Sequence, residues 1–335
     1  SYNGANYSDK KIGGSEIAAV NIAKNLAKYY NVFFAGYNIE PCTYDGVQYI
    51  SPEILRELLE REDIDHMIVS RYVNFFTNFR NTAKKTYLWL HDIAPVPWVN
   101  GKVIHNSGYD LLYNVKDKID KIICLTPWHF NKISTDSQLL DNKIGIIGNG
   151  LNNEDFKGKE IKQKHRFIYA SAYERALPNL LQIFPKIVEK IPDAELHIFS
   201  DVPDELKQLL DEPYFIYHGR VTHEQIIREF EKSDIFFYPS VFETYCICAL
   251  EAQRAGCLCF VSDIGGLADV VAERGIIFKK DDNMVDVIVK TLNNTKLVES
   301  KKKLMKDWAV HQSWENRTQE WLKIMGDELI DIGKQ

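Results

Sequence analysis

The chain has 335 residues, with 41 Lys and Arg against 47 Asp and Glu, and a formal net charge of −6. Hydrophobic residues make up 45% and charged residues 26%, which is typical of globular proteins and excludes a disordered, collagen-like or coiled-coil chain. The lack of a basic excess argues against a nucleic-acid binder, and no run of 18 apolar residues predicts a transmembrane helix. The first residues have no basic and apolar regions of a signal peptide, and the six cysteines are sparse, so we expect a cytoplasmic protein.

Short apolar runs alternate with amphipathic segments along the chain. In the first half, strands are predicted at 32–37, 66–71, 86–91, 121–126 and 144–149, with helices starting near Ser15, Pro52, Asn74 and Trp128. The polar segment 150–164 indicates a linker. In the second half, strands are predicted at 167–171, 195–200, 215–218, 235–238, 257–261 and 276–279, with helices starting near Pro178, Pro203, Thr222, Cys246, Met284 and Trp314.

This alternation is typical of parallel sheets covered by helices on both faces. At about 150 residues per domain, the length predicts two such α/β domains. We place them at residues 1–155 and 156–312, with a terminal helical segment at 313–335. Ligands of doubly wound domains bind beyond the carboxyl ends of the strands, so we expect the two domains to face each other across a cleft.

The first 14 residues are polar and rich in Gly and Asn, and they predict no strand before the first helix. A doubly wound domain normally begins with a strand, often a central one, and without it the neighbouring strands lose ladder partners. We therefore expect the given chain to be part of a longer polypeptide that supplies this strand.

Four of the cysteines form two Cys-x-Cys pairs, Cys246 with Cys248 and Cys257 with Cys259. A zinc site is one interpretation. Positions i and i+2 of a helix point to different faces, and the second pair lies in an apolar run that predicts a buried strand. Buried free cysteines are therefore the favoured interpretation.

The stretch Phe242 to Ala252 holds two glutamates, Glu243 and Glu251, and follows a predicted strand directly. Glu243 falls on the loop and Glu251 about two turns into the next helix, so both can address the same ligand. The start of that helix offers unpaired N–H groups to a phosphate, while carboxylates accept hydrogen bonds from hydroxyls. The combination favours a ligand with phosphate and polyol parts. The structural alternative is that both are ordinary helix residues, one near the helix start and the other solvated.

Two glycine pairs lie next to helix starts. Gly265-Gly266 follows the predicted strand 257–261, and glycines there permit close approach of the backbone to a ligand. Gly13-Gly14 precedes Ser15, which we expect to cap the first helix.

These motifs occur in a recognisable order: Gly13-Gly14-Ser15-Glu16, His91-Asp92, Asn149-Gly150, the two glutamates within PSVFETYCICALEAQRAG, and Gly265-Gly266. SAYERALPNLL, PDAELHIFSD and HGRVTHEQI follow in the second half. In this order the chain resembles the retaining GT-B glycosyltransferases of the group-one type (glycosyltransferase family four). The resemblance implies two Rossmann-like domains, a nucleotide-sugar bound mainly by the C-terminal one, and a last helix that returns to the N-terminal domain.

The resemblance also implies roles for particular residues. Glu243 is expected to bind hydroxyls of the donor sugar, and Glu251 those of the ribose. The expected diphosphate ligands are N–H groups around Thr244, Tyr245 and Cys246, together with Arg175. The nucleobase pocket is expected at Gly219, Arg220 and Val221. His91 is expected near the reacting centre, and Gly13 and Gly14 are expected to close over the phosphate or the acceptor.

One departure from the family pattern lies on the first strand of the second domain. The family often has a Gly-Arg pair there with a Lys five residues after the Arg, whereas this chain has Ala170-Ser171-Ala172 and then Arg175. The phosphate clamp therefore has one side-chain cation in place of two, unless Arg220 substitutes.

The expected activity is transfer of a sugar, with retention, from a nucleoside-diphosphate sugar to an unknown hydroxyl acceptor. No metal or other cofactor is expected, since no Asp-x-Asp triplet suits a divalent ion beside the phosphates. No nucleic-acid partner and at most peripheral membrane contact are expected. The alternatives are a non-catalytic GT-B-like subunit that binds a nucleotide-sugar and, ranked below it, a nucleotide-sugar epimerase.

Overall fold

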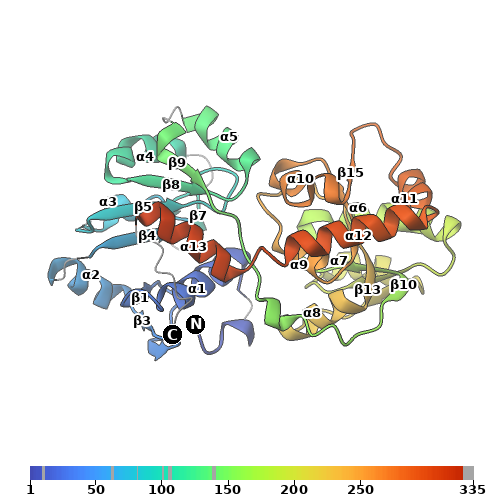
Figure 1. The fold of residues 1–335 in the computed structure, drawn as a ribbon, viewed down its shortest axis with the longest axis horizontal. Helices are drawn as coiled ribbons and strands as arrows, with labels where there is room; N and C mark the ends of the chain where they lie inside the picture. The colour runs from blue at the N-terminus through green and yellow to red at the C-terminus, as the bar shows by residue number, and fades with distance from the viewer. Residues whose placement is uncertain are drawn as a thin grey trace. The chain divides into compact units, whose positions relative to one another are not determined.

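The computed structural model describes residues 1–9, 12–61, 64–80, 82–99, 102–104, 108–137 and 141–326 (Figure 1). The chain divides into two compact units, Ser1–Gly150 with Trp314–Gln335, and Leu151–Ser313. The division falls after Gly150, whereas the sequence places the boundary after residue 155. Both units are α/β with parallel sheets, which confirms the predicted fold class. Among the described residues, no helix is long and apolar enough to cross a membrane.

The second unit is built on one six-stranded parallel sheet in the order β12-β11-β10-β13-β14-β15. The chain first moves outward from β10 in one direction and then returns to place β13 on the other side of β10. The carboxyl ends of β10 and β13 therefore form the topological switch point, where ligands of such sheets bind. The strands are β10 (Gln163–Tyr169), β11 (Glu195–Ile198), β12 (Phe215–Tyr217), β13 (Ser233–Tyr238), β14 (Leu258–Ser262) and β15 (Ile276–Phe278).

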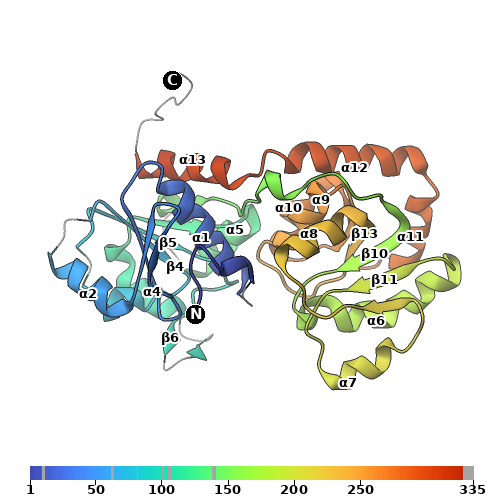
Figure 2. The ribbon, with the colours of Figure 1, turned by 90° about the horizontal axis from the view of Figure 1, so that it is seen from below.

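Helices cover both faces of this sheet. Figure 2 shows α6 (Tyr173–Lys190) and α7 (Asp204–Lys207) on one side, and α8 (His223–Lys232), α9 (Ile247–Arg254) and α12 (Thr295–Ala309) on the other. Contacts between α12 and α9, and between α11 (Met284–Leu292) and α6, agree with this arrangement, and α10 (Gly265–Val271) packs against β14. Short 3-10 turns lie at Asn153–Asp155 (η4), Gln208–Leu210 (η5) and Ala272–Arg274 (η6). Because both faces are covered, the central strands read as continuous apolar runs, and Phe236, Phe237 and Tyr238 are fully buried.

The first unit contains a four-stranded parallel sheet in the order β4-β5-β8-β9 and a separate three-stranded sheet in the order β1-β3-β2. Its strands are β1 (Val32–Ala35), β2 (Cys42–Tyr44), β3 (Val47–Ile50), β4 (His66–Ser70), β5 (Lys85–Trp89), β6 (Trp98–Val99), β7 (Lys102–Val103), β8 (Lys121–Cys124) and β9 (Ile144–Ile146). Its helices are α1 (Gly14–Leu26), α2 (Pro52–Arg61), α3 (Phe75–Asn78), α4 (Gly108–Val115), α5 (Pro127–Ser137) and α13 (Trp314–Met325). Short 3-10 turns lie at Tyr7–Asp9, Lys116–Lys118 and Asp141–Lys143.

The three-stranded and four-stranded sheets of the first unit each end at a strand with a single partner. Among the described strands, β1 pairs only with β3 and β4 pairs only with β5, so each keeps one unpaired edge. Phe33 on β1 is correspondingly 41% exposed, unlike the central strands of the second unit.

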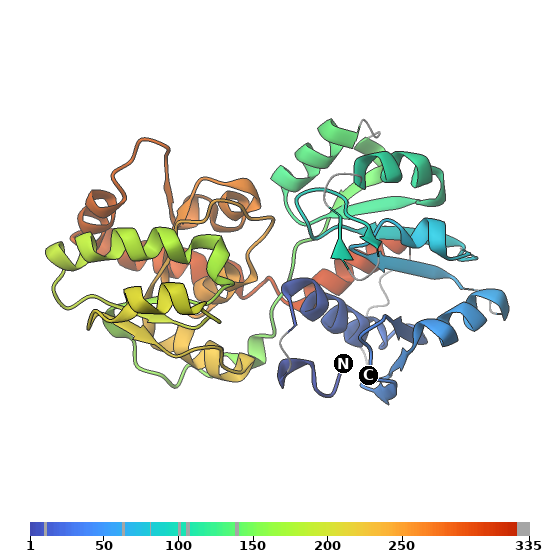
Figure 3. The same ribbon diagram turned by 180° about the vertical axis from the view of Figure 1, so that it is seen from behind.

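Residues of β5 alternate between two layers of the first unit, as the two-residue period of a strand requires. Tyr87 and Trp89 face α13, where their rings lie 6.0 and 5.4 Å from the ring of Trp321. Leu88, and Leu90 directly after the strand, join a core with Leu112 and Val115 of α4. Helix α13 also lies beside α1, the red and dark-blue helices of Figure 3.

Several helix starts differ from the sequence expectation. Helix α1 begins at Gly14 with Gly13 as its N-cap, and the Ser15 hydroxyl instead donates to Glu16 Oε2 at 2.8 Å, so the predicted capping by Ser15 is wrong. Helix α6 begins at Tyr173, which places Pro178 inside it. Proline disfavours a helix interior, but the apolar face of α6, with Leu177, Leu180 and Phe184 buried, outweighs this cost.

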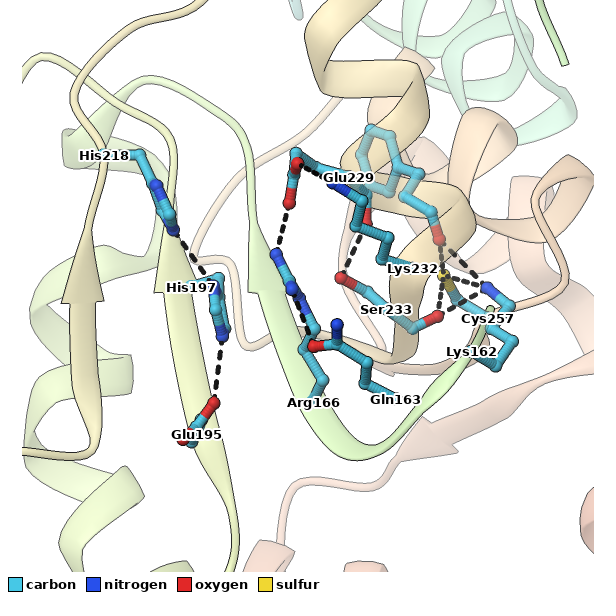
Figure 4. A network of polar contacts seen from close by, with 11 residues as sticks. Lys162, Gln163, Arg166, Glu195, His197, His218, Glu229, Lys232, Ser233 and Cys257 are labelled. Atoms are coloured by element: carbon cyan, nitrogen blue, oxygen red, sulfur yellow. Dashed lines mark hydrogen bonds and ion pairs between the residues drawn. The ribbon is translucent and has the colours of Figure 1, made fainter. Parts of the chain in front are cut away.

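Polar contacts lie along β10, β11 and β12 of the second unit and beside the start of β13 (Figure 4). His197 Nδ1 lies 3.0 Å from His218 Nε2, and His197 Nε2 lies 3.2 Å from Glu195 Oε2. Burial and then the Arg166 charge lower the pKa of His197 to about 4, so this histidine is neutral at physiological pH. Arg166 pairs with Glu229, and Lys162 donates to the backbone oxygens of Phe230 and Ser233. The histidine contacts join β11 to the residue after β12, and the other contacts join β10 and Lys162 to α8 and the start of β13.

Candidate functional site

The switch point of the second unit brings Arg175 and Glu243 together. Arg175 lies in the first turn of α6, just after β10, and Glu243 lies on the loop after β13. The Arg175 Nη1 and Glu243 Oε1 atoms are 3.6 Å apart, and the guanidinium stacks over Phe242 with its carbon 4.4 Å from the ring centre. The backbone oxygen of Arg175 also accepts from the Ser240 hydroxyl at 3.2 Å. The cation and the loop are thus held as one assembly.

The Glu243 carboxylate is oriented by its neighbours. Tyr238 donates its hydroxyl to Oε2 at 3.3 Å, and the Thr244 backbone N–H donates to Oε1 at 3.1 Å. Burial, followed by the charges of Cys246 and Glu243, raises the pKa of Tyr238, so this hydroxyl stays a donor at physiological pH. Both carboxylate oxygens therefore have a fixed direction.

The glycine pair supports the same loop from the other side. The N–H of Gly266 donates to the Glu243 backbone oxygen at 3.0 Å. Gly265 has a φ of +53°, and a Cβ at this position would lie 2.1 Å from that oxygen. The close approach that the sequence assigned to a ligand is, in this structure, an approach of backbone to backbone.

Helix α9 follows directly after this loop in the chain. Its N-cap, Cys246, has a φ of +70°, a left-handed conformation that is costly for a residue with a side chain. Thr244, Tyr245 and Cys246 are all buried. The first N–H groups of a helix have no partner within the helix and favour an anion.

Glu251 lies one turn further along α9 and is 5% exposed. Its Oε1 is 2.7 Å from His223 Nε2 at the start of α8. Burial and then the charges of Glu251 and Glu243 raise the pKa of the Cys248 thiol, one turn before Glu251 on α9.

The segment expected to line a nucleobase pocket lies between β12 and α8. Gly219 has a φ of +69°, and Val221 precedes Thr222, which caps α8 through a reciprocal bond with Gln225. Arg220 faces Asp201 at 3.9 Å, and both side chains are largely exposed. The structure thus pairs Arg220 with a carboxylate, and Arg175 is the cation beside Glu243.

The remaining predicted residues lie in the first unit. His91 follows β5, and its buried Nε2 has no hydrogen-bond partner. Burial, then the charges of Arg71 and His129, lower the pKa of His91 to about 3, so the imidazole is neutral at physiological pH. Gly13 caps α1 and Gly14 begins it, and Glu16 of this helix lies 4.0 Å from Arg71.

Three residues that contact the predicted site residues were not predicted from the sequence: Arg71, Tyr238 and His223. Arg71 makes a two-pronged pair with Asp92, with N–O distances of 2.6 and 2.9 Å. Tyr238 and His223 contact the two glutamates. A signal existed for Tyr238 and Arg71, since each lies at the end of a predicted strand. His223 had none beyond its place near a helix start.

All six cysteines are free. Within the described ranges, no group of three or more His, Cys, Asp or Glu side chains is placed to hold a metal ion.

The second unit matches a family of known proteins. The family description "Glycosyl transferases group 1" matches residues 164–294. A phosphatidylinositol N-acetylglucosaminyltransferase GPI3 subunit of Saccharomyces cerevisiae is 23% identical over 200 residues, which cover 55% of this chain and 44% of that protein. An uncharacterized glycosyltransferase of Methanocaldococcus jannaschii is 25% identical over 297 residues, covering 77% and 74%. The chain thus spans less than half the length of the yeast relative it matches.

Solved structures extend the likeness to both units. A glycosyltransferase from Rickettsia africae superposes with a TM-score of 0.73 at 14% identity, covering 93% of this chain and 94% of that one. HepE of Anabaena, solved in complex with UDP-glucose, gives a TM-score of 0.71 at 11% identity, covering 94% and 96%. The chain has the GT-B fold, and its residues 164–294 match the group 1 glycosyltransferase family.

Proposed function

We propose that this chain is a retaining glycosyltransferase that moves a sugar from a nucleoside-diphosphate sugar to a hydroxyl acceptor without a metal ion. The observation that carries the proposal is the assembly of Arg175, Glu243 and the start of α9 at the switch point of the group 1 domain. It combines a cation and helix N–H groups for phosphate with carboxylates for hydroxyls. The complex of HepE with UDP-glucose supports a donor of this class.

In this proposal, different residues of the second unit bind different parts of the donor. Arg175 leaves Glu243 in part to meet the diphosphate, and the N–H groups at Tyr245 and Cys246 bind the same group. Glu243 accepts hydrogen bonds from the sugar, and Glu251 from the ribose. Gly219, Arg220 and Val221 line the base.

We further propose substitution on one face of the sugar. The bond from the anomeric carbon to the diphosphate oxygen breaks through an oxocarbenium-like state, and the acceptor oxygen bonds to the same face. The acceptor proton passes to the departing phosphate. Helix N–H groups and Arg175 stabilise the charge that develops there. The neutral imidazole of His91 and the glycines Gly13 and Gly14 would act from the first unit.

The first unit offers a pocket for the acceptor. It is lined by aromatic and amide side chains, which suit the faces and hydroxyls of a saccharide or polyol. Its lining includes Tyr37, Asn74, Asn78, Trp98, Asp110 and Asn114.

A second candidate is a non-catalytic subunit that binds a nucleotide-sugar. The observation in its favour is the likeness to a yeast protein that is named as a subunit. The two candidates differ in whether the donor is consumed.

Product analysis tests the proposal. The chain is incubated with UDP-N-acetylglucosamine, UDP-glucose or GDP-mannose and with glycerol, an alkyl glycoside or phosphatidylinositol, with and without a chelator. We expect nucleoside diphosphate to be released and the product, read by proton NMR, to keep the donor's anomeric configuration in both conditions. An inverted product, or loss of turnover with the chelator, contradicts the proposal. Binding without turnover favours the non-catalytic candidate.

A further inference from the structure

His223 and Glu251 form a pair beside the proposed donor site. A role of this pair in donor binding rests on the proposed function. Glu251 is a nearly buried carboxylate on the helix that is proposed to hold a diphosphate. A buried carboxylate is costly unless it is paired, and beside a diphosphate it is also repelled. Something must offset its charge.

The structure supplies one candidate cation at Glu251. His223 Nε2 lies 2.7 Å from Glu251 Oε1, which is within hydrogen-bond distance. The other ring nitrogen, Nδ1, lies 4.0 Å from Asp155 Oδ2 of η4. The imidazole therefore stands between two carboxylates that come from different segments.

Hydrogen bonds fix the backbone at His223 and the turn that carries Asp155. His223 is the first residue of α8, directly after the capping residue Thr222, so its backbone is fixed. The turn η4 is tied to α9 because Arg254 Nε donates to Asn153 Oδ1 at 2.7 Å. The contact between His223 and Glu251 is thus built into the packing of α8, α9 and η4.

We infer that His223 is a positioning residue for the donor: it fixes the Glu251 carboxylate toward the ribose hydroxyls and offsets its negative charge beside the diphosphate. His223 occupies Oε1, which leaves the second oxygen of Glu251 for a ribose hydroxyl. A protonated imidazole also reduces the repulsion between the carboxylate and an anionic ligand.

The charged groups around His223 set the direction of its pH dependence. Burial opposes the charged imidazole, but the Glu251 carboxylate, its hydrogen bond and Asp155 outweigh it and raise the pKa of His223 above its usual value. Asp155 is flanked by Glu154, and Arg254 of α9 is turned to Asn153 and to the ring of Phe156. Glu224, the next residue of α8, pairs with Arg228.

An anionic donor binds more tightly to the protonated form, so its affinity falls as pH rises through the pKa of His223. A donor-induced increase of about one unit in that pKa corresponds to a change of about tenfold in the dissociation constant. Nucleoside-diphosphate sugars suit the measurement because their bridging phosphates do not titrate near neutral pH.

Calorimetric titrations of UDP-glucose, UDP-N-acetylglucosamine and GDP-mannose between pH 5.5 and 8.5 test the inference. For the wild type we expect the dissociation constant of the bound donor to rise about tenfold with pH. In His223→Gln, the amide can still donate to Glu251 but carries no charge, so we expect binding that does not vary with pH and resembles the wild type at high pH. His223→Ala is expected to bind more weakly still.

The matched control is His165→Gln. His165 Nδ1 is also paired with a carboxylate, Asp193 Oδ1 at 2.8 Å, on the amino end of β10. We expect this variant to keep the wild-type pH curve. A wild-type pH curve in His223→Gln, or wild-type affinity in His223→Ala, would overturn the inference.

A second readout separates this inference from the proposed function. In an NMR titration of the free protein we expect the pKa of His223 to lie above the usual histidine value and to fall in Glu251→Gln. If the wild type binds none of the three donors, the proposed function is contradicted, and so is the role of Glu251 toward the ribose. If it binds and the His223 pKa does not respond to Glu251→Gln, the inference alone is wrong.

Discussion

Replacing Gly265 with alanine is expected to destabilise the second unit by about 2–4 kcal/mol and to abolish donor binding. The residue has a left-handed φ of +53°, and the added Cβ would lie 2.1 Å from the backbone oxygen of Glu243. That oxygen accepts the N–H of Gly266, so the new atom must move the loop that carries Glu243. Urea unfolding monitored by fluorescence measures the stability, and calorimetry measures the binding.

Gly158→Ala is the matched control for this experiment. Its φ of +64° is similar, but a Cβ there meets no atom within 4 Å. We expect a loss of about 1 kcal/mol from the backbone conformation alone, with donor binding unchanged. Equal losses in the two variants would contradict a steric role of Gly265 beneath Glu243.

Replacing Trp321 with alanine is expected to cost the first unit about 3–5 kcal/mol of stability. Trp321 is fully buried, and its ring packs on Trp89 and Tyr87 of β5. Removing it leaves a cavity between α13 and the sheet. Thermal and urea unfolding of the variant measure the loss.

Lys323→Ala changes an exposed residue of the same helix, and its effect is expected to stay within about 0.5 kcal/mol. A Trp321→Ala variant as stable as Lys323→Ala would show that α13 does not cover β5. The pair of variants therefore tests whether the terminal helix contributes to the first unit.

The sheets were largely predictable because apolar runs mark buried strands. The runs at 235–238 and 257–261 correspond to β13 and β14, whose residues are buried on both faces. Strands β2 and β3 were missed, since their short segments mix polar and apolar residues around the turn at Asp45 and Gly46.

Helix starts and side-chain partners were less predictable. The period of α12 is obscured in the sequence by the run Lys301 to Lys303, of which Lys303 is exposed while Lys302 pairs with Asp234. Cys246 gave no sign of its left-handed conformation, because glycine is the residue that usually indicates one. The contact between His223 and Glu251 joins residues 28 positions apart, and only the packing of α8 on α9 brings them together.

The candidate site was predictable where a motif coincided with a strand end. Arg175 and Glu243 follow β10 and β13, and the strand order makes these two ends adjacent. Arg220 was offered as a second phosphate cation, but its partner in the structure is Asp201. The order of strands, which the sequence does not state, decides which predicted residues meet.

The most direct test of the account is whether the wild-type chain binds a nucleoside-diphosphate sugar through Glu251. Thermal-shift and calorimetric titrations with UDP-, GDP-, ADP- and TDP-sugars are run on the wild type and on Glu251→Ala. At about 100 times the dissociation constant, one nucleotide class should stabilise the wild type by about 2.7 kcal/mol and the variant much less. No stabilisation of the wild type by any of them, or equal stabilisation of both proteins, would contradict the assignment of the donor site.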